Sequence, residues 1–400
     1  MRNQVLQVNL QEKFGGGEVY TALLCRALDY LGVKTILFCH PKALFWNNLP
    51  LPDSCTRVPI KPGLLLAHLP LQRSWILNHG SLTAKQIEMM SKQHLLTGVV
   101  HMPPQGRPKD RYDSYHCVFG VSNHVVEGLR AIGAPVWDSP LYAVAELRSR
   151  ISGDKLQQRS FYDWDKRKFR DRMFSWFEPL FGLLRPRFFF ERKPGITLGI
   201  VSRLTPIKQF PTLFKIIAPL LAQYPEFNLE IFGSGGYASV RDLKLALRPL
   251  GKRVRFWGQQ HDVATVYSKL DYLLTGLPEK EALGLNVLEA QACGTPVLAV
   301  NAPPFTETVK DGDSGLLFCD PRLDGGVDFE KLLLRIISTR EIIDPRLASD
   351  HLAHFSFTAF SDRLRPIIAW ASALLDLESM IIPNVFNLSN SLLQAGYCKK

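Results

Sequence analysis

The stretch VLQVNLQEKFGGGEVYTALLCRALDYLGVKTILFC, residues 5–39, decides the fold class. It begins with a mostly apolar run typical of a strand, which leads into the three glycines of residues 15–17. Residues 18–31 then place apolar side chains on one face of a helix, and Gly32 fits the end of that helix. Residues 35–39 form a short apolar run typical of a buried parallel strand. This βαβ order predicts an α/β fold with a doubly wound parallel sheet.

Short apolar runs and helical stretches keep alternating along the rest of the chain. Ser122 fits the N-cap of a helix that Gly133 closes. Further strands are predicted at residues 95–100, 116–121, 196–201, 229–232, 254–257, 272–275 and 296–300. We therefore expect an N-terminal domain over 1–194, a second doubly wound domain over 195–380, and a polar tail over 381–400.

Composition narrows the class of protein. A chain of 400 residues with 46% hydrophobic residues favours two packed domains over disorder. The seven cysteines form no C-x-x-C pair, which argues against a zinc site or a disulfide framework. The first ten residues lack the apolar core of a secretory signal, so we expect a cytoplasmic protein. The formal net charge of +11 suits phosphorylated ligands, an anionic membrane surface or nucleic acid.

Two basic residues follow a predicted strand of the second domain. Arg203 comes two residues after the run 196–201, and Lys208 lies five positions further on. The carboxyl ends of strands in such sheets open onto the ligand crevice, so both cations are candidates for binding a diphosphate. Two solvated surface cations would give the same spacing, and the pattern alone leaves both interpretations open.

A glycine turn comes next along the chain. Gly233 and Gly235 directly follow the predicted strand 229–232. Glycine lets a backbone approach a ligand closely, but any tight turn gives the same pattern.

Two glutamates, Glu281 and Glu289, lie eight residues apart around the start of a helix predicted over 286–293. Gly284 and Leu285 stand at the mouth of that helix, where free backbone N–H groups suit a phosphate. Carboxylates beside such a site accept hydrogen bonds from sugar hydroxyls. Two glutamates on a helix surface are the alternative. The later Asp311-x-Asp313 lacks the rest of a calcium loop and predicts a turn, so no metal site is expected.

Taken in order, these features resemble the second domain of the retaining GT-B glycosyltransferases of family 4, the glycosyl transferases group 1. The likeness runs over residues 199–318, and its most specific element is the E-x7-E pattern of Glu281 and Glu289. The resemblance implies an α/β GT-B fold, in which two Rossmann-like doubly wound parallel-sheet domains face a cleft.

The resemblance also implies roles for the site residues, and it implies transfer with retained anomeric configuration. Glu281 would contact the transferred sugar as a catalytic residue, and Glu289 would hold the ribose. The donor diphosphate would lie against Arg203, Lys208, Gly284 and Leu285, and the nucleotide loop would contain Gly233 and Gly235. Ala282-Leu283 departs from the family pattern, which often has phenylalanine at the second position; this puts the preference for the donor sugar in doubt.

The first domain resembles the family less closely. Gly16 and Gly17 open the first helix and resemble the glycine loop that meets the donor phosphates, although a flexible turn would look the same. His101 follows the predicted strand 95–100 and resembles the histidine that points at the donor sugar. A structural histidine is the alternative. Other candidates for the same role are His68, His79, His94, His116 and His124.

Residues 151–193 differ from both domains, with 11 Lys/Arg against 6 Asp/Glu and 11 aromatic residues. Basic and apolar residues at helical spacing over 165–184 suit an anionic membrane surface along 161–190, or a lid folded on the protein. No nucleic acid is expected as a partner. Asp163-Trp164-Asp165 resembles a metal-binding D-x-D but is better explained as the start of this helix.

The sequence therefore predicts a retaining, metal-independent hexosyltransferase without a cofactor, peripheral to the inner face of the membrane. It would move a sugar from a UDP-linked donor to a cell-envelope saccharide or lipid-linked acceptor, and so serve polysaccharide or lipopolysaccharide biosynthesis. UDP is the default because uridine is the commonest base in the family. Alternatives are a nucleotide-sugar epimerase or phosphorylase on the same fold, and a non-catalytic nucleotide or nucleic-acid binding protein.

Overall fold

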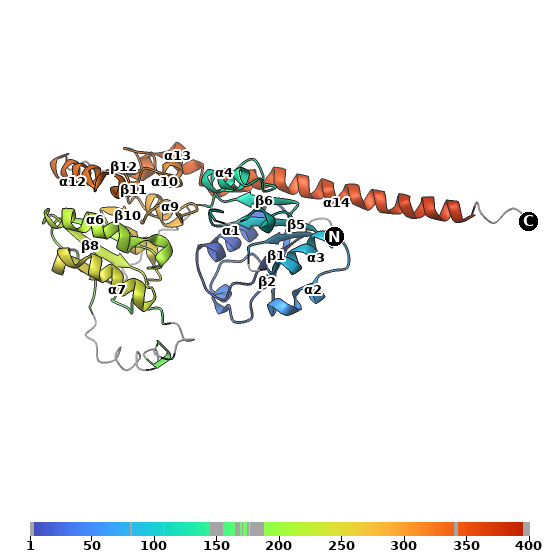
Figure 1. Ribbon diagram of the computed structural model, residues 1–400, viewed down its shortest axis with the longest axis horizontal. Coiled ribbons are helices and arrows are strands. Elements are labelled where there is room, and N and C mark those ends of the chain that lie inside the picture. The colour runs from blue at the N-terminus through green and yellow to red at the C-terminus, as the bar shows by residue number, and fades with distance from the viewer. Residues whose placement is uncertain are drawn as a thin grey trace, which may run out of the picture. The chain divides into compact units, whose positions relative to one another are not determined.

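The computed structural model describes residues 4–80, 82–106, 108–144, 155–164, 169, 171–173, 176, 188–339 and 343–394 (Figure 1). The chain divides into two compact units. The first unit combines Met1–Ala143 with Phe357–Lys400, and the second is Val144–Ser356.

The first unit contains a six-stranded parallel sheet in the order β3-β2-β1-β4-β5-β6. Its strands are β1 (Gln4–Asn9), β2 (Lys34–Cys39), β3 (Cys55–Pro59), β4 (Trp75–Asn78), β5 (Leu95–Val100) and β6 (Cys117–Gly120). Its helices are α1 (Gly16–Tyr30), α2 (Leu65–His68), α3 (Ala84–Gln93), α4 (Asn123–Ala131) and α14 (Phe357–Gln394).

The second unit contains a second six-stranded parallel sheet, in the order β12-β11-β10-β7-β8-β9. Its strands are β7 (Ile196–Val201), β8 (Phe227–Phe232), β9 (Val254–Phe256), β10 (Tyr272–Leu274), β11 (Val297–Val300) and β12 (Gly315–Phe318). The helices are α6 (Phe210–Ala222), α7 (Tyr237–Ala246), α8 (Val263–Tyr267), α9 (Leu285–Ala292), α10 (Phe305–Thr308), α11 (Pro321–Asp324), α12 (Val327–Thr339) and α13 (Ser349–Ala353).

Both sheets are doubly wound, which confirms the predicted fold class. The order of strands reverses between β1 and β4 in the first sheet and between β7 and β10 in the second. In open parallel sheets the crevice beyond the carboxyl ends of the strands at such a reversal is where ligands bind. Each unit therefore has one position at which a site is expected.

The burial of apolar side chains in the core explains why these segments form strands and helices. Strands β5 and β8 are buried along their whole length, as strands covered on both faces are. Strand β5 is mostly aliphatic, whereas β8 also buries Glu230, which is ion-paired with Arg255. Helix α6 turns Leu213, Phe214 and Ile217 towards the core of the second unit, and all three are fully buried.

The boundaries of the units differ from the predicted 1–194 and 195–380. The first part of the basic aromatic segment belongs to the second unit, because Gly235 N–H donates to Phe161 C=O at 3.1 Å and Asp163 N–H donates to Gly235 C=O at 2.8 Å. At the other end, α14 returns to the first unit, where the Phe360 ring lies 5.7 Å from that of Tyr20.

Helix α14 continues to Gln394, into the first part of the predicted tail over 381–400; the remaining residues lie outside the described part. The helix predicted over 165–184 also lies mostly outside the described residues. No helix in the described ranges is both long enough and apolar enough to span a membrane.

Candidate active site

The reversal point of the second sheet carries the basic residues predicted from the sequence. Arg203 follows β7 by two residues, is exposed, and its guanidinium makes no hydrogen bond or ion pair within the described residues. Lys208 ends the short 3-10 turn Pro206–Lys208, and only 21% of its side chain is exposed. Both cations thus lie beyond the carboxyl end of β7.

Lys208 is ion-paired with Glu281, the first glutamate of the E-x7-E pattern. Glu281 lies in the loop between β10 and α9, so the pair joins the two strands at which the sheet reverses. The absence of a side chain at Gly276 lets this loop pack closely against Lys208, since a Cβ at Gly276 would lie 2.2 Å from the Lys208 carbonyl oxygen. The ammonium has three N–H donors, so it can keep Glu281 and still donate to an anion.

Glu289, the second glutamate, faces a buried tyrosine. The Tyr267 hydroxyl donates to Glu289 Oε2 at 2.9 Å. Burial raises the pKa of Glu289 to about 7, although the Tyr267 hydrogen bond and the Lys208 charge both act to lower it. No described residue donates to Oε1, which leaves this oxygen as an acceptor for a ligand.

Helix α9 presents its N-terminus at the same edge of the sheet. Gly284 caps the helix in the left-handed region at φ 86°, which glycine adopts without strain. Asn286 Nδ2 donates to the Val201 carbonyl at 3.2 Å and so fixes the helix start to the end of β7. The first two N–H groups of the helix, those of Leu285 and Asn286, lack intrahelical partners and suit an anion.

Gly233 and Gly235 directly follow β8, where both pack closely against backbone. A Cβ on Gly233 would lie 1.8 Å from the Ser202 carbonyl oxygen, and one on Gly235 would lie 2.1 Å from that of Leu204. Leu204 N–H donates to the Ser234 carbonyl at 2.8 Å. These glycines therefore let the loop after β8 pack against the loop that carries Arg203.

The first unit brings the start of α1 next to His101. Helix α1 begins at Gly16, and a Cβ on Gly17 would lie 4.0 Å from His101 Cδ2. The edge of the His101 ring meets the Tyr20 ring, with centroids 5.0 Å apart. Burial lowers the pKa of His101 to about 4, so this side chain is neutral at pH 7.

His79, one of the alternative histidine candidates from the sequence, lies directly beside His101. It directly follows β4, and its Nδ1 lies 3.1 Å from Nε2 of His101. Its Nε2 lies 2.8 Å from Gln7 Oε1 on β1. The available signal was the polar pair Asn78-His79 after the apolar run Trp75–Leu77, but β4 is only four residues long.

The predicted residues thus form two groups. One group, in the second unit, is Arg203, Lys208, Glu281, Gly284, Leu285 and Glu289, with Gly233 and Gly235 behind it. The other, in the first unit, is Gly16, Gly17 and His101. Within the described ranges, no three His, Cys, Asp or Glu side chains gather as a metal ion would require.

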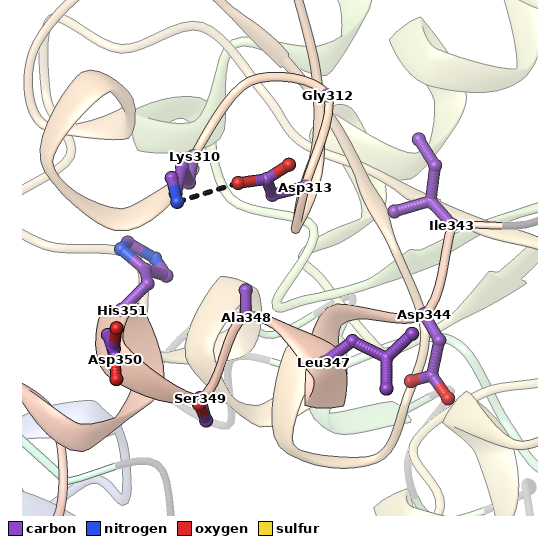
Figure 2. Close-up of a pocket in the computed structure, with 10 residues that line it drawn as sticks. All are labelled: Lys310, Gly312, Asp313, Ile343, Asp344, Leu347, Ala348, Ser349, Asp350 and His351. Carbon is purple, nitrogen blue, oxygen red and sulfur yellow. Dashed lines mark ion pairs between the residues drawn. The ribbon is translucent and has the colours of Figure 1, made fainter.

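A cavity of about 320 Å³ lies elsewhere in the second unit (Figure 2). It is lined by Lys310, Gly312, Asp313, Ile343, Asp344, Leu347, Ala348, Ser349, Asp350 and His351. Several of its polar groups already have partners: Lys310 pairs with Asp313 at 2.7 Å, and His351 Nε2 donates to the Thr308 carbonyl at 3.0 Å. None of the predicted site residues lines this cavity.

Solved structures identify the class of fold. HepE of Anabaena, solved with UDP and glucose, superposes with a TM-score of 0.60 at 17% identity, covering 92% of this chain and 99% of that one. Sucrose-phosphate synthase of Thermosynechococcus elongatus gives 0.63 at 17% identity, covering 93% and 100%. With its two doubly wound sheets, this chain has the two-domain, Rossmann-like GT-B fold.

Sequence comparison adds a family for part of the chain. Residues 186–329 match the family model of the glycosyl transferases group 1. The D-inositol 3-phosphate glycosyltransferase of Stackebrandtia nassauensis is 34% identical over 186 residues, which are 42% of this chain and 40% of the relative. That of Corynebacterium jeikeium is 32% identical over 182 residues, 42% of each. The chain thus matches about two fifths of the length of these relatives.

Proposed function

We propose that this protein is a glycosyltransferase that moves a sugar from a UDP-linked donor to an acceptor hydroxyl, with retention and without a metal. The observation that carries the proposal is the Lys208–Glu281 pair, held beside Arg203 and the start of α9 at the reversal point of the second sheet. Sequence similarity to glycosyltransferases covers this same part of the chain, residues 186–329.

The proposed donor site follows from charge and hydrogen-bonding capacity. Arg203 and Lys208 supply fixed positive charge, and the N–H groups at Leu285 and Asn286 supply neutral donors, a combination suited to a diphosphate. Glu289, with one oxygen held by Tyr267 and the other free, would accept hydrogen bonds from the ribose hydroxyls. HepE, which shares the fold, was solved with UDP, and this supports UDP as the nucleotide to test first.

In the proposed mechanism the acceptor oxygen bonds to the anomeric carbon on the face from which the diphosphate departs. The bond between that carbon and the diphosphate oxygen breaks, and the acceptor proton passes to the leaving phosphate. Arg203 and Lys208 stabilise the negative charge that builds on the leaving group, and Glu281 orients the sugar. No described side chain is assigned as a covalent nucleophile.

Two observations bear on the acceptor. We keep the hypothesis of a cell-envelope saccharide or lipid-linked acceptor, with 161–190 as the membrane contact; it rests on the basic and aromatic residues of 151–193. The curated relatives are named for D-inositol 3-phosphate, a small cyclic polyol that bears a phosphate, and it belongs among the acceptors to be tested.

Thermal unfolding in the presence of nucleotides tests the donor site. UDP and UDP-sugars, with chelator present, should raise the unfolding temperature, because a ligand that binds only the folded state stabilises it. The adenosine, guanosine and cytidine equivalents serve as comparisons. Arg203→Ala should reduce sugar transfer from the best donor by about 10²–10³-fold, as loss of a charge-stabilising donor does. Lys215→Ala, which removes a lysine of α6, is the matched control. Near-normal turnover in Arg203→Ala would refute the proposal.

A further inference from the structure

A chain of hydrogen bonds runs through the interior of the first unit and ends at His101. Gln7 Nε2 lies 3.3 Å from Cys25 Sγ, and Gln7 Oε1 lies 2.8 Å from His79 Nε2. His79 Nδ1 then lies 3.1 Å from His101 Nε2. Gln7 is fully buried and His79 is 6% exposed, so water has little access to the middle of this chain.

The chemistry of each group fixes where the protons sit. The amide nitrogen of Gln7 can only donate, and it points at the Cys25 sulfur. Its oxygen therefore accepts from His79, which places the His79 proton on Nε2. Burial lowers the pKa of His79 well below its usual value, so the ring is neutral and its Nδ1 is a bare acceptor.

Two groups approach that acceptor, Thr21 and His101. The Thr21 hydroxyl has one hydrogen, and its oxygen lies 2.8 Å from the Gly17 carbonyl but 3.2 Å from His79 Nδ1. The carbonyl takes this hydrogen, because it is closer and lies one helical turn back on α1. His79 Nδ1 therefore accepts the hydrogen bond that His101 donates from Nε2–H. The other nitrogen of His101, Nδ1, is then unprotonated and has no hydrogen-bond partner among the described residues.

We infer that His79 is a positioning residue, which holds His101 in the neutral tautomer protonated on Nε2. Nδ1 of His101 is then a fixed hydrogen-bond acceptor for a hydroxyl of the transferred sugar. The inference rests on the proposed function and deepens it. A neutral acceptor of this kind takes a hydrogen bond from a hydroxyl and has nothing to offer a phosphate oxygen. Nδ1 of His101 therefore favours a sugar hydroxyl over a phosphate oxygen.

Nitrogen-15 NMR of the ligand-free full chain tests the tautomer directly. With the histidine rings labelled, long-range correlation spectra report which nitrogen carries the proton. We expect His101 to be protonated on Nε2 alone, whereas the exposed His261 of the second unit should show an exchanging mixture. A proton on Nδ1 of His101, or a mixture like that of His261, overturns the inference.

Paired substitutions separate positioning from simple packing. His79→Asn keeps an acceptor oxygen near the position of Nδ1 and should preserve the tautomer of His101, whereas His79→Phe keeps a ring without an acceptor and should move His101 towards the mixture of His261. Gln7→Met, which leaves both rings in place, should shift the tautomer in the same direction as His79→Phe. An unchanged His101 in both His79→Phe and Gln7→Met contradicts the role of His79.

Donor affinity links the tautomer to the proposed reaction. His79→Phe should weaken binding of a UDP-sugar by about five- to tenfold, the effect of one hydrogen bond, while UDP alone should bind as in the wild type. His79→Asn should restore the affinity for the UDP-sugar. If neither nucleotide binds the wild type, the proposed function fails while the NMR result still decides the tautomer. An equal loss for UDP and the UDP-sugar overturns the assignment to the sugar.

Discussion

The two glycine-rich loops, residues 15–17 and 233–236, look alike in the sequence but have different surroundings. In the second unit the space beside Gly233 is filled by backbone, at 1.8 Å from a hypothetical Cβ, and the loop serves to fix the segment that carries Arg203. In the first unit the nearest atom to a Cβ on Gly17 is 4.0 Å away. A glycine after a strand therefore indicates either backbone packing or room for a ligand, and only the structure separates the two.

The two units also differ in charge. The second unit places Arg203 and the ion pair of Lys208 with Glu281 at the reversal point of its sheet. The first unit places His79 and His101 at the corresponding point, and burial keeps both neutral. On the proposed function, the charged group would hold the diphosphate and the neutral group the sugar.

The largest effect is expected from Gly233→Ala, which should lower the free energy of unfolding by about 1–3 kcal/mol. Its φ of 150° is strained for other residues, and the added Cβ would overlap the Ser202 carbonyl oxygen. Urea denaturation measures the change. Gly236→Ala is the matched control, because a Cβ there meets nothing within 4 Å. If both variants have the same free energy of unfolding, close backbone packing is not the reason for a glycine at position 233.

The sequence predicted most where the signal is local. Strands β5 and β7 begin and end at the predicted residues, because each is a run of six that is aliphatic apart from one threonine and one glycine. Strand β3 was missed because its side chains are largely exposed, and β4 because it has only four residues. The end of α14 was missed because Pro383 and its asparagines are more typical of a polar tail.

The difference between local and long-range signals also applies to the site. Arg203, Lys208 and the two glutamates could be proposed from the sequence because the two cations follow β7 and the two glutamates bracket the start of α9. The relation of His79 to His101 could not, because it arises from contacts between β1, β4 and β5, which are distant in the sequence.

A separate effect is expected from pH, acting through Glu289. The pKa of about 7 in the folded protein exceeds the value of about 4.3 in an unfolded chain, so the folded state keeps a proton that the unfolded state has lost. The free energy of unfolding should therefore decrease as pH rises from about 4 to about 7. Binding of the ribose needs the ionised acceptor, so affinity for a UDP-sugar should rise over the same titration, by up to about tenfold between pH 6 and pH 8.

Isothermal titration with a UDP-sugar measures this dependence, and the donor itself loses no proton in that range because its diphosphate is a diester. Glu289→Gln, which cannot titrate, should bind more weakly and with an affinity independent of pH. A pH dependence that persists in Glu289→Gln would assign the effect to another group and remove Glu289 from the ribose site.

The smallest effect on stability, and the sharpest test of the comparison, is expected from Gly17→Ala. Its Cβ would lie at ordinary contact distance from the His101 ring, so the free energy of unfolding should change by less than about 0.5 kcal/mol, unlike that of Gly233→Ala. If the space beside Gly17 is kept for a ligand, transfer activity should nevertheless fall, because the methyl group occupies the approach to the helix start. Gly32→Ala is an unsuitable control, since its φ of 75° adds strain of its own; Gly63→Ala, with nothing within 4 Å and no such strain, is the better one. Full activity in Gly17→Ala would mean that the first glycine loop, too, is only a turn, and the contrast between the two loops would then lie in packing alone.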